Sequence, residues 1–205
     1  MRSGFRGIVL AGGKSSRFGE DKALATMNGK TLLETAVNRL KGVGLCVTVI
    51  TNRARDYSCL GLECDIQRDM IEERGPLGGL YTACRLFPRQ ALLVTTCDMP
   101  AVTAASMKEL SSRHKRESLV TLFSMNGADL PFPGIYESAL EDFILSYIQQ
   151  NRLSMSGLLA QLPSIHRLQG FCSDELFINI NKRKDFEDYL RDDSRVNELH
   201  VKKVK

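Results

Sequence analysis

The sequence predicts an α/β protein with three layers, in which helices cover both faces of a mostly parallel sheet. Short apolar runs alternate with segments whose apolar residues recur at helical spacing, and glycines or prolines separate the two kinds of segment. The first three segments have the order strand, helix, strand. Because such a crossover joins parallel strands and is right-handed, it predicts the core of a parallel sheet.

The first half of the chain supplies the predicted parallel strands. Residues Gly7–Ala11 form an apolar run that stops at a glycine pair, as a buried strand leading into a loop would. Helical spacing then predicts a helix over Thr31–Leu40, and the β-branched run Cys46–Thr51 predicts the next strand. The alternation continues with a weak strand at Glu63–Gln67, a helix at Leu77–Leu86, a buried strand at Ala91–Thr96, a helix at Thr103–His114 with Thr103 as N-cap, and a strand at Leu119–Phe123.

The second half of the chain is less regular. Pro131 and Pro133 interrupt the next extended segment, and because proline has no N–H for a ladder we expect an edge or irregular segment there. The other predicted elements are helices at Ser138–Gln149, Ser156–Leu162 and Lys184–Leu190 and strands at His166–Leu168 and Leu176–Ile180. With no repeat and no linker in view, we expect one domain over residues 1–205.

The composition is that of an ordinary globular protein, with 43% hydrophobic and 25% charged residues among 205. No run approaches the roughly 20 apolar residues that span a bilayer, and no secretory signal stands at the start, so we expect a cytoplasmic protein without a membrane partner. A net charge of +4 with interspersed signs argues against a nucleic-acid partner. The six cysteines lack CxxC spacing, so we interpret them as reduced, although a pairing of Cys59 with Cys64 stays open.

The loop after the first predicted strand contains several cationic side chains. In an open α/β sheet this loop is the usual phosphate site, because its glycines let backbone N–H groups converge on an anion. Ser15 and Ser16 add hydroxyl donors, and Lys14, Arg17 and Lys22 add positive charge. A solvated basic loop is the alternative interpretation. Neither GxxxxGK[ST] nor GxGxxG is present, so neither a P-loop NTPase nor a dinucleotide dehydrogenase is supported.

The string LAGGKSSRFGEDKAL, Leu10–Leu24, resembles the LAGGxSxRMGxDKxL signature of the MobA-like nucleotidyltransferases, the family of molybdenum cofactor guanylyltransferases. Further motifs follow in the family's order: TNR at Thr51–Arg53, RD at Arg68–Asp69, GPLGGL at Gly75–Leu80, CDMP at Cys97–Pro100 and NIN at Asn179–Asn181. The resemblance implies the nucleotide-diphospho-sugar transferase-like fold. It implies a Rossmann-like nucleotide-binding half over about residues 1–115, a pterin-substrate half over about 116–195 and a tail over 196–205.

The resemblance also implies a function and a site. The function is transfer of GMP from GTP to the phosphate of the molybdopterin-bound molybdenum cofactor, with Mg²⁺ as cofactor, pyrophosphate as product, and a molybdoenzyme or cofactor-delivery protein as partner. The implied site consists of Leu10, Ala11, Gly12, Gly13, Lys22, Asn52, Asp69, Gly75, Gly78 and Asp98 for the nucleotide, of Arg17, Lys22 and Asp98 for catalysis, of Asp98 for the metal, and of Asn179 and Asn181 for the pterin.

Several of these roles have a plainer alternative. Asp98 is also consistent with a turn aspartate, Asp69 with a surface acid, Asn52 with a cap, and the glycines of Gly75–Leu80 with a turn before a helix. A related transferase that uses CTP or a sugar phosphate, and a nucleotide-binding relative without activity, remain rival functions.

The sequence also departs from the family pattern. Phe18 stands where methionine is usual, and Thr96 stands where proline is common before the CD pair. Lys182 and Arg183 replace the usual Thr-Pro after NIN, which removes a helix-start signal and adds charge that would suit an anionic substrate.

Overall fold

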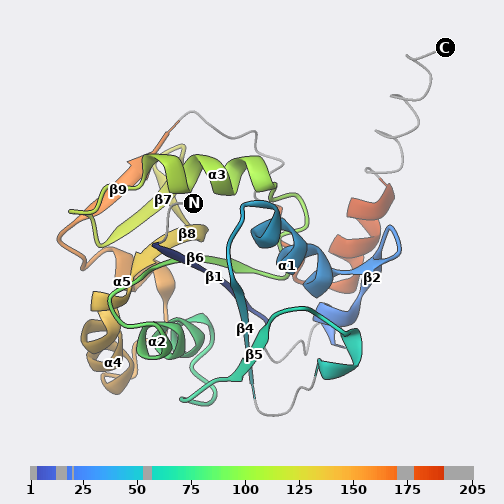
Figure 1. Ribbon diagram of the computed structural model, residues 1–205, viewed down its shortest axis with the longest axis horizontal. Coiled ribbons are helices and arrows are strands. Elements are labelled where there is room, and N and C mark those ends of the chain that lie inside the picture. Colours follow the sequence, from blue (N-terminus) through green and yellow to red (C-terminus); the bar gives the residue numbers. More distant parts are fainter. Residues whose placement is uncertain (1–3, 13–17, 20, 53–56, 170–177, 192–205) are drawn as a thin grey trace.

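The computed structural model describes residues 4–12, 18–19, 21–52, 57–169 and 178–191. Within these residues, a seven-stranded sheet has the order β5-β4-β1-β6-β8-β7-β9 (Figure 1). The strands are β1 (Phe5–Leu10), β4 (Val47–Thr51), β5 (Asp65–Arg68), β6 (Ala91–Thr96), β7 (Val120–Met125), β8 (Ala128–Glu137) and β9 (Ile165–Leu168). A small hairpin of β2 (Thr26–Met27) and β3 (Lys30–Thr31) stands apart from this sheet.

The first four strands of the sheet run parallel, as the crossover pattern predicts. β1 lies at their centre and pairs with β4 on one side and with β6 on the other, and β4 pairs with the edge strand β5. The carboxyl ends of these strands therefore reach the same edge of the sheet. Of the remaining strands, β8 is antiparallel to both β6 and β7, and β9 is parallel to β7.

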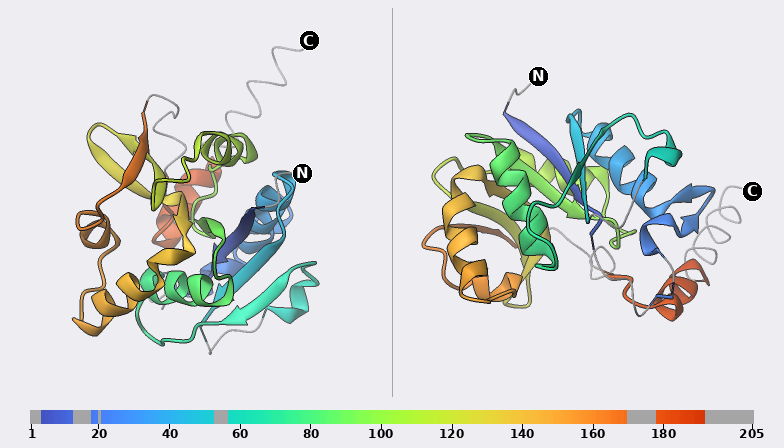
Figure 2. Two further views of the ribbon diagram at one scale, coloured as in Figure 1. Left: turned by 60° about the vertical axis from the view of Figure 1, so that its left-hand side comes forward. Right: turned by 90° about the horizontal axis from the view of Figure 1, so that it is seen from below.

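Helices cover both faces of the sheet, which confirms the three-layer prediction. Alternate residues of β1 point to opposite faces: Ile8 packs in one core with α2 and α4, whereas Val9 packs in the other with α1 and α3. Figure 2 shows the two helical layers on either side of the strands. The helices are α1 (Leu32–Gly42), α2 (Pro76–Leu86), α3 (Ala104–Arg113), α4 (Glu141–Gln149) and α5 (Met155–Leu159), with short 3-10 turns η1 (Lys22–Leu24), η2 (Ser58–Leu60) and η3 (Ser138–Leu140).

Local capping explains where the helices start. Thr103 caps α3 as predicted, since its hydroxyl accepts from the backbone N–H of Ser106 and the Ser106 side chain accepts from the N–H of Thr103. Thr31 and Glu34 form the same reciprocal pair at the start of α1. Among the described helices, none is long and apolar enough to cross a membrane.

The edge position expected around Pro131 and Pro133 was wrong, because β8 is a central strand between β6 and β7, whereas the irregularity expected there is confirmed. The strand accommodates both prolines in an irregularity. Residues 134–137 pair with β6, and pairing with β7 resumes at residues 128–130 after a register shift between Leu122 and Phe123. Residues 131–133 have no partner in either ladder, so the missing proline N–H groups break no ladder bond.

The segment before the last helix also differs from its prediction. Of the strand expected at Leu176–Ile180, the first two residues lie outside the described part of the chain, and residues 178–180 have no regular secondary structure. A helix follows over residues 183–191. Asp185 replaces the missing start signal, because its Oδ2 accepts from the backbone N–H groups of Asn181 and Lys182 at 2.9 and 2.8 Å.

That last helix packs against the N-terminal part of the chain. Phe186 joins Phe18 in a small core with Ile180 and residues of the β2-β3 hairpin region. The guanidinium of Arg183 lies 5.7 Å from the centre of the Phe18 ring. Two of the residues that depart from the family pattern, Phe18 and Arg183, therefore contact each other through a cation–π interaction.

Candidate functional site

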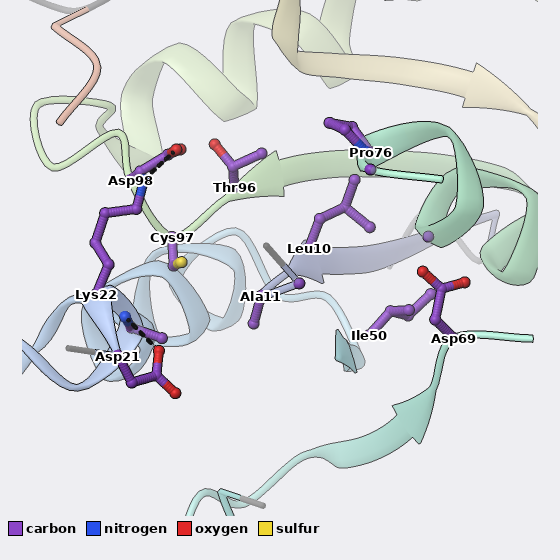
Figure 3. A pocket seen from close by; sticks show the side chains of 14 residues that line it. Leu10, Ala11, Asp21, Lys22, Ile50, Asp69, Pro76, Thr96, Cys97 and Asp98 are labelled. Carbon is purple, nitrogen blue, oxygen red and sulfur yellow. Dashed lines mark hydrogen bonds and ion pairs between the residues drawn. The ribbon is translucent and has the colours of Figure 1, made fainter. Parts of the chain in front are cut away.

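A pocket opens at the edge of the sheet where the parallel strands end (Figure 3). Its lining comes from the ends of β1, β4 and β6, from the residue after β5, from the start of α2 and from η1. The lining residues are Leu10, Ala11, Gly12, Asp21, Lys22, Ala23, Ile50, Asp69, Gly75, Pro76, Gly79, Thr96, Cys97 and Asp98. Ligands of open α/β sheets bind at this edge, so the pocket lies where the sequence predicts the nucleotide.

Lys22 and Asp98, 76 residues apart in the sequence, meet at one end of the pocket. The Lys22 ammonium donates to Asp98 Oδ2 at 2.7 Å and to the carbonyl oxygen of Ile180 at 2.8 Å. The backbone N–H of Ile180 donates in turn to the Asp98 carbonyl at 2.9 Å. The first strand-to-helix loop, the end of β6 and the NIN segment are thus joined at one point.

One oxygen of Asp98 is available to a ligand. Asp98 Oδ1 is buried and has no hydrogen-bond partner among the described residues. Because a buried carboxylate oxygen without a partner is costly, this atom fits an Mg²⁺ ion, which takes oxygen ligands and often binds one or two carboxylates together with substrate phosphates. In the part of the chain that the structure describes, no cluster of three or more His, Cys, Asp or Glu side chains forms a metal site.

Cys97, beside Asp98, is not a candidate nucleophile. Burial raises the pKa of its thiol to about 12, so the thiolate is scarce at neutral pH. The five cysteines among the described residues, Cys59 and Cys64 included, are free thiols, in agreement with the reduced state predicted for them.

Asp69 lies across the pocket from the Lys22–Asp98 pair, with the end of β1 between them (Figure 3). Its backbone N–H bonds to the carbonyl of Thr51 at 2.8 Å, which fixes the turn after β5. Burial raises the pKa of the Asp69 carboxyl above its usual value, and a hydrogen bond from Thr82 opposes that rise. The pocket therefore has a carboxylate at one end and an ion pair at the other.

The glycines of the GPLGGL motif have three different positions. Gly75 has a φ of +58° and caps α2, whose first residue is Pro76. Gly79 lies against β1, where a Cβ atom would stand 2.9 Å from Leu10 Cδ2. Gly78 does not line the pocket; a Cβ there would lie 3.0 Å from Asp69 Oδ2. Gly78 therefore makes room for the aspartate rather than for the ligand itself.

Asn52 lies beside Gly12 at the ends of β4 and β1. An added Cβ at Gly12 would be 3.7 Å from the Asn52 backbone nitrogen. Asn52 Oδ1 is buried and without a hydrogen-bond partner within the described residues, so it too is an acceptor that a ligand donor would satisfy.

Asn179 and Asn181 flank Ile180 and have exposed side chains. Through Ile180 they lie next to Asp98, at the same edge of the sheet as the nucleotide pocket. Two further predicted site residues, Gly13 and Arg17, lie outside the described residues.

Sequence reasoning missed several residues that support the site. The Tyr57 hydroxyl donates to Asp21 Oδ2 at 3.1 Å and lies 3.3 Å from the Ala11 carbonyl, so it links the two ends of the first loop. Asp21 also caps η1 and thereby orients Lys22. Asp21 belongs to the family signature, whereas no spacing or composition signal points to Tyr57.

The fold and this pocket define an α/β nucleotidyltransferase. The chain belongs to the MobA-like NTP transferase domain family, whose model matches residues 7–164.

Several relatives in this family cover most of the chain. A Flavobacterium johnsoniae protein named "Probable molybdenum cofactor guanylyltransferase" is 31% identical over 183 residues, 88% of this chain and 94% of that protein. A Geobacillus protein of the same name is 30% identical over 191 residues, 90% and 97% of the two chains. The crystal structure of molybdopterin-guanine dinucleotide biosynthesis protein A from Archaeoglobus fulgidus shares the fold, with a TM-score of 0.79, 20% identity and coverage of 93% and 99%.

Proposed function

We propose that this protein transfers GMP from GTP to the terminal phosphate of the molybdopterin-bound molybdenum cofactor. The products are the guanine dinucleotide form of the cofactor and pyrophosphate. One observation carries the proposal: Lys22 and Asp98 form an ion pair at the carboxyl edge of the parallel strands, and both contact the NIN segment. The guanylyltransferase names of the relatives support the same activity.

The pocket suits a nucleotide because its two ends have different chemistry. The phosphates would lie toward Gly12 and Lys22, where backbone N–H groups and an ammonium favour negative charge. The base would lie toward Asp69, whose ionised carboxylate accepts hydrogen bonds. Guanine presents two neighbouring donors, N1–H and the 2-amino group, which a carboxylate can bind together.

The reaction requires no covalent intermediate on the protein. An oxygen of the acceptor phosphate attacks the α-phosphorus of GTP in line, a new phosphorus–oxygen bond forms, and the bond to the bridging oxygen breaks. Pyrophosphate leaves with the electron pair. Lys22 would move from Asp98 to the phosphates and neutralise the charge that grows on their oxygens, while Asp98 would hold Mg²⁺, which when bound supplies further charge neutralisation there.

The acceptor would approach from the NIN segment. Asn179 and Asn181 carry exposed carboxamides that both donate and accept, which is the chemistry that the mixed donor and acceptor edge of a pterin requires. Because they lie on either side of Ile180, whose N–H bonds to the Asp98 carbonyl, an acceptor bound by them would lie beside Asp98 and the α-phosphate.

Thermal unfolding with GTP, CTP, ATP or UTP, each with Mg²⁺, is the first test. We expect GTP to raise the melting temperature most, because binding to the folded state stabilises it. A larger shift with CTP would overturn the guanylyl assignment. Pyrophosphate release with GTP and molybdopterin is the second test, and a protein that binds GTP but releases no pyrophosphate would be a binder rather than a transferase.

A further inference from the structure

A wholly buried threonine contacts the carboxylate at the base end of the pocket. Thr82 is on α2 and has no exposed surface. Its hydroxyl donates to Asp69 Oδ1 at 2.7 Å and accepts from the backbone N–H of Met70 at 2.9 Å. Threonine hydroxyls inside helices commonly bond to a carbonyl of their own helix. This one instead joins α2 to the turn that follows β5.

The second oxygen of Asp69 is confined by the same helix. An added Cβ at Gly78 would lie 3.0 Å from Asp69 Oδ2 and 2.8 Å from the carbonyl oxygen of Ile71. Gly78 and Thr82 are four residues apart, so they lie on the same face of α2. A hydroxyl therefore holds one carboxylate oxygen, and close backbone packing limits the position of the other.

This arrangement matters because a carboxylate that recognises guanine must be ionised and correctly directed. Burial alone favours the neutral form of Asp69, and the hydrogen bond from Thr82 favours the ionised form. Without the hydroxyl, the carboxylate would keep only its bonds to the backbone N–H groups of Met70 and Ile71, and the Met70 N–H would lose the hydroxyl as an acceptor. Both changes would weaken a paired contact to the N1–H and 2-amino donors of guanine.

We propose that Thr82 is a positioning residue for base selection, which holds Asp69 in the orientation that distinguishes GTP from purine nucleotides lacking the 2-amino group. This inference rests on the proposed function. Thr82 does not line the pocket, so it acts through Asp69 rather than by contact with the nucleotide.

Thr82→Val and Thr82→Ser test the proposal. Valine has a similar shape and lacks the hydroxyl, whereas serine keeps it. In a pyrophosphate-release assay with GTP and with inosine triphosphate, we expect Thr82→Val to raise the KM for GTP about tenfold while kcat stays within about twofold. The ratio of kcat/KM for GTP to that for inosine triphosphate should fall by a similar factor, and Thr82→Ser should restore it.

Thr121→Val is the matched control. Thr121 is also wholly buried and also bonds through its hydroxyl, to His114 Nδ1 at 2.9 Å, but it lies on β7 away from the pocket. We expect this variant to keep the wild-type KM and the wild-type nucleotide ratio. A fall in the ratio equal to that of Thr82→Val would show a general effect of buried hydroxyls and overturn the proposal.

Other outcomes separate this inference from the function on which it rests. If Thr82→Val does not fold, Thr82→Cys, whose thiol is a weaker donor, should give an intermediate ratio. An unchanged ratio in the folded variant overturns the role of Thr82 and leaves the guanylyl transfer intact. A wild-type enzyme that uses GTP and inosine triphosphate equally well would also overturn the role of Thr82 in base selection and leave the guanylyl transfer intact. A wild-type protein that does not use GTP at all overturns the proposed function itself.

Discussion

Replacing Lys22 with methionine should have opposite effects on metal binding and on turnover. The Lys22 ammonium lies 2.7 Å from Asp98 Oδ2, and the two side chains are only 15% and 19% exposed. A divalent cation at the unpaired Oδ1 must compete with this ammonium for the negative charge of the same carboxylate. A hydrogen bond to a charged partner in such a setting contributes about 1.5–3 kcal/mol, so removal of the ammonium should tighten metal binding in the absence of nucleotide by about 10- to 100-fold.

Turnover should change in the other direction. A cationic donor to the transferring phosphates is worth about 3–4 kcal/mol of the barrier, so we expect Lys22→Met to lower kcat by about 100- to 1,000-fold. Calorimetric titration with Mn²⁺ and no nucleotide measures the first effect, and pyrophosphate release measures the second. Lys41→Met is the control, because Lys41 pairs with the exposed Glu63 at the surface. Mn²⁺ affinity that is unchanged or weaker in Lys22→Met would refute the competition.

Three further predictions concern other parts of the site and the fold. Arg39 donates to the two backbone carbonyls that follow Asp98, and burial lowers the pKa of its guanidinium. Arg39→Met should raise the Mg²⁺ concentration required for half-maximal turnover several-fold. Arg39→Lys should raise that concentration less, because lysine keeps a cationic donor. Burial raises the pKa of Asp69 above the ordinary value of 3.8, so on acidification the carboxylate is protonated, and GTP affinity is lost, at a higher pH than an ordinary aspartate would give. Binding titrations at several pH values should show this loss in the wild type, whereas the GTP affinity of Asp69→Asn should not change over the same pH range. Thr103→Ala removes the cap of α3 and should lower the free energy of unfolding by about 1 kcal/mol in urea, with kcat unchanged.

The parallel half of the fold was predictable because its signals are local. β6 has the predicted bounds, and α3 begins after the predicted cap. β8 was missed because proline normally excludes a central strand, and the register shift that accommodates Pro131 and Pro133 depends on the neighbouring strand β7. The strand expected over Leu176–Ile180 is absent from residues 178–180 for a similar reason, since the Ile180 N–H bonds to the Asp98 carbonyl, beyond the end of β6.

The residues of the candidate site also differ in whether they could be predicted from the sequence. Lys22, Asp69 and Asp98 could be predicted because they belong to a long motif set in a recognisable order. Their supporting residues could not. Thr82 and Arg39 each make two hydrogen bonds, to partners 12 and 13 residues away and 60 and 61 residues away, and such contacts leave no periodicity or spacing in the sequence.

A crystal structure with GTP and Mg²⁺ would show directly how the site binds its substrate. We expect the Lys22 ammonium to have left Asp98 for the phosphates, the Asp98 carboxylate to contact the metal ion, and guanine to lie against Asp69. A nucleotide bound elsewhere on the molecule, or one bound in the pocket while the Lys22–Asp98 ion pair stays intact, would contradict this expectation.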